Sequence, residues 1–164
     1  MVLMNEVIKV IVVGVSATAV MDAWSMLLKF FGIPMLNYAL VGRWIGHLLQ
    51  GRFAHTSIAK SAPVQGELAL GWGIHYVIGI AFSALLVGIQ GVAWLHNPTL
   101  LSAIAVGMAT VAFPLFVMQP AMGAGFLALR TPTPLKNCIR SLATHTVFGC
   151  GLYLSAALLK QLGA

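Results

Sequence analysis

The chain has 164 residues, of which 60% are hydrophobic and only 7% are charged, and its mean hydropathy is +0.96. Soluble domains carry about 25% charged residues, so this composition excludes a water-soluble globular protein and indicates one membrane domain. The net charge of +6 comes from basic residues that cluster in the loops, which is typical of membrane topology and does not indicate nucleic-acid binding.

Four apolar segments follow one another along the chain, each with the length of about 20 residues that a membrane span requires. They lie at residues 7–31, 66–91, 99–128 and 139–163. The first contains Ala17-Thr18-Ala19, which resembles a signal-peptidase site, but the apolar run continues to Phe31, so we expect a retained span. The sequence therefore predicts an all-α fold, a polytopic membrane four-helix bundle.

The segment between the first two spans predicts a short amphipathic helix at about residues 39–54. Its apolar side chains recur at helical spacing, and its polar side chains fall on the opposite side of the helix. The apolar side chains are Val41, Trp44, Ile45, Leu48 and Leu49. The polar side chains are Arg43, His47 and Gln50. Such a helix lies flat in the headgroup region of a bilayer. An interfacial anchor is the simpler interpretation, and a gate over the bundle is the alternative.

The distribution of Lys and Arg predicts the orientation of the spans. Seven of these residues lie around the first and third connections, whereas the other two, Lys9 and Lys160, lie near the ends of the chain. The positive-inside rule then places loops 32–65 and 129–138 in the cytoplasm. We expect a bacterial inner-membrane protein with both termini in the periplasm, in contact with the lipid bilayer.

A polar side chain interrupts each of the four apolar segments: Asp22, His75, Gln119 and His145. A charged group at bilayer depth costs on the order of 3 kcal/mol, so its default interpretation is functional. Counted from the cytoplasmic end of each helix at about 1.5 Å per residue, the four groups come out about 10–13 Å deep. We therefore predict one buried polar layer, in which Asp22 pairs with a histidine or with Gln119.

Small residues share the helix faces that carry this layer. Gly14 and Thr18 precede Asp22 at helical spacing, and Gly79 follows His75. Small side chains let membrane helices approach closely, so these faces should point into the bundle. The third span is different, because Pro114 and Pro120 each remove a backbone donor and Gly123 and Gly125 follow them. A plain kink is the simpler interpretation, and a broken helix at a transport site is the alternative.

Several kinds of function fit the polar layer. The first is structural: a hydrogen-bonded clasp fixes helix register in a homo-oligomer or in a subunit of a larger membrane complex. The second is proton-linked transport, since carboxylate and imidazole groups are suitable proton carriers. The third is a cofactor site, in which His75 and His145 ligate haem iron or bind a transition metal together with Asp22. The simplest expectation is that no cofactor is bound.

An enzyme that acts on lipid is a further alternative, but no nucleophile, phosphate loop or metal motif indicates one, so no catalytic residue is assigned. Secondary polar candidates are Glu67 at the start of the second span, Arg43 and His47. Cys138 and Cys150 have no metal-type spacing, and we expect no disulfide between them.

Five short patterns occur in a fixed order: VMDAW, GR-x3-H-x3-GRFAH, GE-x3-GWGIHY-x2-G, MQPAMGAG and H-x2-FG-x-GLY. In this order the chain resembles, over essentially its whole length, a bacterial family of small four-span inner-membrane proteins classed as a domain of unknown function. The resemblance implies the fold and the location and no particular activity. It carries over a set of family-type positions, which are Asp22, Arg43, His47, Glu67, His75, Gln119, Gly123 and His145.

Overall fold

The computed structural model describes residues 2–163, and those residues form helices and loops without any strand. Four helical segments are long and apolar enough to cross a membrane, which confirms the all-helical, four-span prediction. They are Asn5–Phe30, Glu67–Gln90, Leu100–Met122 and Pro134–Gln161.

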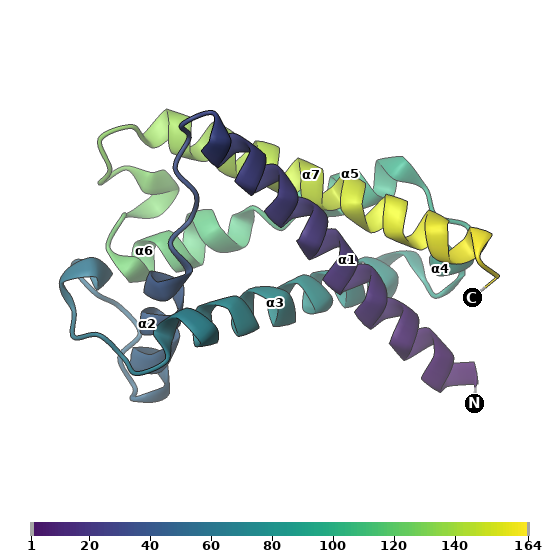
Figure 1. Ribbon diagram of the computed structural model, residues 1–164, viewed down its shortest axis with the longest axis horizontal. Coiled ribbons are helices and arrows are strands. Elements are labelled where there is room, and N and C mark those ends of the chain that lie inside the picture. Colours follow the sequence, from purple (N-terminus) through teal and green to yellow (C-terminus); the bar gives the residue numbers. More distant parts are fainter. Residues whose placement is uncertain (1, 164) are drawn as a thin grey trace. The chain divides into compact units, whose positions relative to one another are not determined.

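The helices follow one another in the order shown in Figure 1. The α-helices are α1 (Val2–Phe30), α2 (Tyr38–Leu49), α3 (Glu67–Gln90), α4 (Ala93–His96), α5 (Leu100–Ala109), α6 (Gln119–Met122) and α7 (Pro134–Gln161). Three short helices of other types complete the chain; η1 (Ile58–Lys60) and η3 (Phe126–Ala128) are 3₁₀ turns, and η2 (Pro114–Met118) is a π-helix.

The third and fourth spans begin or end at other residues than predicted. The third was expected to continue to residue 128, but α6 ends at Met122 because Gly123 adopts a left-handed conformation with φ of 98°. The fourth was expected to begin at residue 139, but α7 begins at Pro134, since proline fits the first position of a helix, where no backbone donor is needed. The predicted loop 129–138 is therefore wrong in extent and becomes residues 123–133.

The contacts between residues divide the chain into two compact units. Unit 1 contains α1, α4, α5 and the C-terminal parts of α3 and α7, which are residues 2–34, 76–110 and 143–163. Unit 2 contains α2, α6, the short helices η1, η2 and η3 and the N-terminal parts of α3 and α7, which are residues 35–75 and 111–142.

The helices of unit 1 meet at small residues. A Cβ atom added to Gly14 of α1 would lie 2.6 Å from the Cα of Ile80 on α3, and one added to Gly107 of α5 would lie 2.6 Å from the Cα of Gly149 on α7. The predicted small-residue faces are therefore helix contacts, as close packing in a membrane requires. The buried core beside them is apolar and includes Val13, Leu86, Phe148 and Leu152.

In unit 2 the backbone of α2 lies directly against the first turns of α3. A Cβ atom added to Gly42 would lie 1.7 Å from the carbonyl oxygen of Glu67, and one added to Gly71 would lie 1.8 Å from that of Tyr38. Only glycine permits such an approach at both positions. A small apolar cluster of Trp44, Ile58 and Ala121 completes this unit.

The packed side of α2 differs from the predicted apolar side. His47 was expected on the polar side, yet it is buried, with 3% of its surface exposed. In contrast, Leu48 and Leu49 from the expected apolar side are exposed. Burial of His47 is tolerated because both of its ring nitrogens have hydrogen-bonding partners. The helix also ends at Leu49, short of the predicted residue 54.

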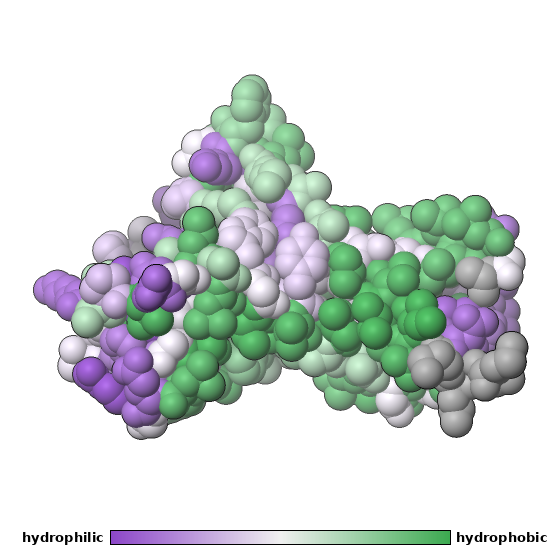
Figure 2. Space-filling model, turned by 60° about the horizontal axis from the view of Figure 1, so that its bottom comes forward, coloured by the Kyte–Doolittle hydropathy of each residue, from purple (hydrophilic) through white to green (hydrophobic). Residues whose placement is uncertain are grey.

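Apolar side chains cover long stretches of the surface drawn in Figure 2. Large hydrophobic residues on the spans are exposed, among them Phe30, Leu101 and Leu135. A water-soluble protein rarely exposes a large continuous apolar surface. The exposed apolar helix faces therefore fit contact with the hydrocarbon interior of a membrane.

Candidate functional site

Asp22 lies on α1 within unit 1 and is 4% exposed. The Oη of Tyr76, at the start of the unit 1 part of α3, donates a hydrogen bond of 3.0 Å to Asp22 Oδ2. A buried carboxylate without a donor would be expensive in a membrane. The phenol hydroxyl therefore supplies part of what Asp22 needs. The predicted pairing of Asp22 with a histidine or with Gln119 stays a prediction.

His145 on α7 and Thr110, which follows α5, form a second polar pair in unit 1. Thr110 Oγ1 lies 2.6 Å from the carbonyl oxygen of Gly107 and 2.8 Å from His145 Nδ1. The hydroxyl has one hydrogen, which it donates to the carbonyl, so its oxygen accepts from the imidazole. This geometry assigns the proton to Nδ1 of His145 and joins two helices through one hydroxyl group.

His75 belongs to unit 2 and has a tyrosine partner. The Oη of Tyr38, the first residue of α2, lies 3.0 Å from His75 Nε2. The Tyr38 ring also packs against the His75 ring, with centroids 4.6 Å apart, and against Trp72, with centroids 4.1 Å apart. The imidazole is therefore fixed by a hydroxyl group and an aromatic wall.

Gln119 also belongs to unit 2, at the junction of the π-helix η2 and α6. Its depth was estimated for a regular helix that continues to Ala128, and that premise is wrong because α6 ends at Met122. The side-chain Oε1 of Gln119 is buried and accepts no hydrogen bond from any residue in the described part of the chain. A π-helix often occurs at a functional site, so this amide is the least satisfied member of the predicted layer.

Arg43 and Glu67 form a two-point ion pair between α2 and α3. Arg43 Nε donates to Glu67 Oε2 and Nη2 donates to Oε1, both over 2.8 Å. Arg43 Nη1 also donates to the carbonyl oxygens of Ala59 and Ser61, and Glu67 Oε2 accepts from the backbone of Val64. We call these residues the Arg43 cradle; parallel Arg–carboxylate bonds fix orientation as well as charge.

His47 and His55 lie in contact within unit 2, outside the spans. His47 Nε2 donates to the carbonyl oxygen of Ala62 over 3.0 Å, and His47 Nδ1 lies 2.8 Å from His55 Nε2. In the neutral pair, His55 is therefore the donor and His47 Nδ1 the acceptor. Burial of His55, followed by repulsion from His47, lowers the pKa of His55 below its usual value.

The structure thus gives polar partners to Asp22, His75 and His145 from elements that the sequence does not bring together. Sequence reasoning missed Tyr38, Thr110 and His55 as those partners. Tyr38 and His75 are 37 positions apart, so helical spacing carries no signal for their contact. A single common layer of all four groups stays a prediction.

Metal ligation through His75, His145 and Asp22 was one of the open alternatives. Among residues 2–163, no group of three or more histidine, cysteine or acidic side chains is arranged to hold a metal ion. Ligation of haem by His75 and His145 stays a prediction. Cys138 and Cys150 are both free thiols.

Comparison with known proteins identifies the family. A family model described as "Protein of unknown function (DUF2938)" matches residues 11–159, so the chain belongs to this family. The predicted resemblance to a family of unknown function is confirmed. Neither the curated proteins nor the solved structures include a match to the chain.

Proposed function

We propose that this chain, as a member of that family, acts as a structural or accessory subunit of a membrane assembly. Its buried polar groups hold the helices in a fixed register and carry no substrate. The assembly is a homo-oligomer or a larger membrane complex, and the chain itself performs no chemistry.

The observation that supports this proposal is that ionisable groups of the spans meet hydroxyl groups on other elements. Asp22 accepts from Tyr76, and His145 contacts Thr110. One such hydrogen bond contributes about 0.5–1.5 kcal/mol net, and up to about 3 kcal/mol with a charged partner. Loss of one partner would remove a hydrogen bond that a buried polar group makes in this helix arrangement, so each pair favours this arrangement over others.

The outward faces of the spans support a role within an assembly. Within the most apolar 18-residue stretch of each span, only 22% to 39% of the residues are buried inside the structure. The remaining residues are available to lipid or to other subunits, whose helices would pack by the same small-residue and van der Waals contacts.

The assembly is tested by the size of the complex in native membranes. The tagged chain, expressed at its natural level and extracted in mild detergent, should migrate well above the purified monomer on a native gel. Thr110→Val should weaken that complex because it removes the hydroxyl group, whereas the matched control Thr110→Ser should keep it. A wild-type chain that migrates only as a monomer, before and after chemical crosslinking, would contradict the proposal.

The bacterial inner membrane, with both termini in the periplasm, is the location that the basic loops favour. Single cysteines at the exposed positions Gln50 and Gln90 test it in a chain whose own cysteines are replaced by serine. A membrane-impermeant thiol reagent added to spheroplasts should label position 90 and leave position 50 unlabelled. The opposite pattern would reverse the orientation.

Proton-linked transport is the second candidate, and the unsatisfied Gln119 Oε1 next to a π-helix favours it. Irregular backbone at membrane depth is tolerated where it is buried in protein or lines a water-filled path. Reconstituted vesicles with an entrapped pH dye test this candidate under an imposed pH gradient. Flux above that of protein-free vesicles, reduced by Gln119→Leu, would support transport; flux equal to that of protein-free vesicles would remove it.

A further inference from the structure

Unit 1 contains an open apolar groove between α1 and α3. Its volume is about 780 Å³, and its walls include Val7, Val10 and Ile11 from α1 and Ile80, Ala84 and Gly88 from α3. This volume is within the range of about 300–1,000 Å³ typical of small-molecule sites. Both walls belong to segments that are long and apolar enough to cross a membrane, so lipid is a molecule of the right kind to enter the groove.

Gly88 lines the groove without contributing a side chain to it. A Cβ atom added at this position would meet no atom within 4 Å, whereas one added to Gly79 on the same helix would lie 1.9 Å from Thr18 Oγ1. Helix contact therefore explains glycine at position 79 and does not explain it at position 88. Glycine lowers helix stability by about 1 kcal/mol relative to alanine, and at position 88 the space beside the helix is unfilled.

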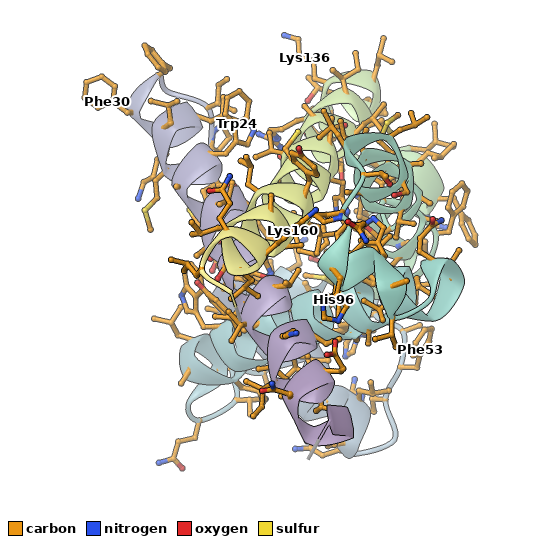
Figure 3. The ribbon with its side chains drawn as sticks, turned by 90° about the vertical axis from the view of Figure 1, so that its right-hand side faces the viewer. Trp24, Phe30, Phe53, His96, Lys136 and Lys160 are labelled. Carbon is orange, nitrogen blue, oxygen red and sulfur yellow. The ribbon has the colours of Figure 1, made fainter. Side chains whose placement is uncertain are left out.

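One charged residue, Glu6 of α1, also lines the groove. Its Oε1 lies 3.2 Å from Lys9 Nζ and 3.3 Å from Nε2 of His96, which Figure 3 shows beside α1. Its Oε2 is buried and accepts no hydrogen bond from any described residue. The groove therefore combines an apolar trough with a carboxylate oxygen that lacks a donor.

We propose that this groove binds a phospholipid whose headgroup has a primary ammonium group, as in phosphatidylethanolamine. One acyl chain lies between α1 and α3, and the ammonium group donates a hydrogen bond to Glu6 Oε2. The charge and the donor together select this headgroup. A quaternary ammonium group has no N–H to donate, and a lipid with net negative charge is repelled by the carboxylate. This inference does not depend on the proposed subunit role.

Competition between lipids tests the headgroup. The purified full chain, stripped of lipid in neutral detergent, is given equal amounts of phosphatidylethanolamine, phosphatidylcholine and phosphatidylglycerol with identical acyl chains, and the bound lipid is counted by native mass spectrometry. We expect phosphatidylethanolamine to be retained about tenfold over the other two, which corresponds to about 1.4 kcal/mol. Equal retention of all three lipids, or preferential retention of another, would overturn the proposal.

Two variants of the ion pair separate headgroup recognition from general damage. Glu6→Gln and Lys9→Gln both remove the Glu6–Lys9 ion pair, but only Glu6→Gln removes the charge that attracts an ammonium group. We expect Glu6→Gln to lose the preference and Lys9→Gln to keep it. The same loss in both variants would contradict a direct contact between Glu6 and the headgroup.

A matched pair of glycine variants tests the acyl-chain site. Gly88 and Gly73 both lie on α3, and a Cβ atom at either would meet open space, but only Gly88 lines the groove. Gly88→Leu should abolish retention of the lipid, and Gly73→Leu should retain it as the unchanged chain does. Equal retention by the two variants, with both melting temperatures at or above that of the unchanged chain in lipid-free detergent, would exclude the groove as the binding site.

Discussion

The two units of this protein satisfy their buried polar groups in different ways. In unit 2, outside most of the apolar length of the spans, Arg43 has a bidentate carboxylate partner and backbone carbonyl partners. In unit 1, Asp22 and His145 each meet a hydroxyl group on another helix. The Arg43 cradle of unit 2 therefore resembles the polar interior of a soluble domain, whereas Asp22 and His145 of unit 1 rely on neutral hydroxyl groups, which are less costly to bury in a membrane than charged groups.

This difference indicates where each unit is sensitive. In unit 2 a network of charge-assisted bonds and backbone contacts is shared between several segments, so removal of one member disturbs the others. In unit 1 each polar pair stands among apolar and small-residue contacts, so removal of one pair should have a local effect. The following predictions test this contrast, from the largest expected effect to the smallest.

Alanine at Gly42 or Gly71 should have the largest effect, because its Cβ atom would lie within 2 Å of a backbone carbonyl oxygen. Neither helix backbone can yield as a side chain could, so we expect a loss of more than about 3 kcal/mol, at or above the upper end of the usual range for overpacking. Thermal unfolding in detergent measures it. Gly73→Ala is the control, because Gly73 lies on α3 near Gly71 and a Cβ atom at this position meets open space. This variant should unfold at or slightly above the temperature of the unchanged chain.

Substitution of Arg43 should have the next largest effect. Arg43→Gln removes the positive charge and the two parallel N–H donors that bind Glu67, so unit 2 should unfold at a clearly lower temperature. Arg43→Lys should fall between this variant and the unchanged chain, because lysine keeps the charge but cannot form both parallel bonds. Proteolysis of the segment between α2 and α3 reports the opening of this unit. Equal resistance of all three chains would show that the cradle has no part in stability.

Thr110→Val should have a moderate effect. Valine keeps the shape of threonine but leaves His145 Nδ1 without its hydroxyl partner, which should cost about 1–2 kcal/mol of unfolding free energy. Chemical unfolding in detergent measures it, with Thr110→Ser as the control that retains the hydroxyl group. If valine and serine give the same stability, the hydroxyl contact is not what holds these helices.

Acidification should have the smallest effect, and it should act on unit 2. Burial lowers the pKa of His55 in the folded protein, so as the pH falls below about 6.5, the usual value for histidine, the unfolded chain takes up the proton first. Stability contributed by this group is therefore complete above that pH and declines below it. His47, whose ring contacts His55, and Arg52 both oppose its protonation. In His55→Gln the decline in melting temperature below pH 6.5 should be shallower; a slope equal to that of the unchanged chain would contradict this assignment.

The sequence predicts the elements of this fold better than the contacts between them. Long apolar segments and small residues at helical spacing predict the four spans and the faces around Gly14 and Gly79, because both signals are local. The Thr-Pro sequence before Leu135 marks the start of α7, but the apolar run that predicts the fourth span begins only at residue 139. The end of the third span depends on the backbone conformation at Gly123, for which several outcomes fit the sequence.

The partners of the polar residues are harder to predict from the sequence. Asp22, His75 and His145 stand out in the sequence because ionisable residues are rare in an apolar segment. Tyr38 and Thr110 do not stand out, since tyrosine and threonine are residue types that are common in such segments. Tyr76 and Asp22 are 54 positions apart, so only the folded chain brings them together. The burial of His47 likewise depends on His55 and on the carbonyl oxygen of Ala62, which no periodicity on α2 indicates.

A double-mutant cycle between Asp22 and Tyr76 tests most directly whether the polar groups of the spans act as clasps. The unfolding free energies of Asp22→Leu, Tyr76→Phe and the double variant are compared with that of the unchanged chain. We expect a coupling energy of about 1–2 kcal/mol, the range for a hydrogen bond to a buried carboxylate. Additive effects with no coupling would contradict this expectation.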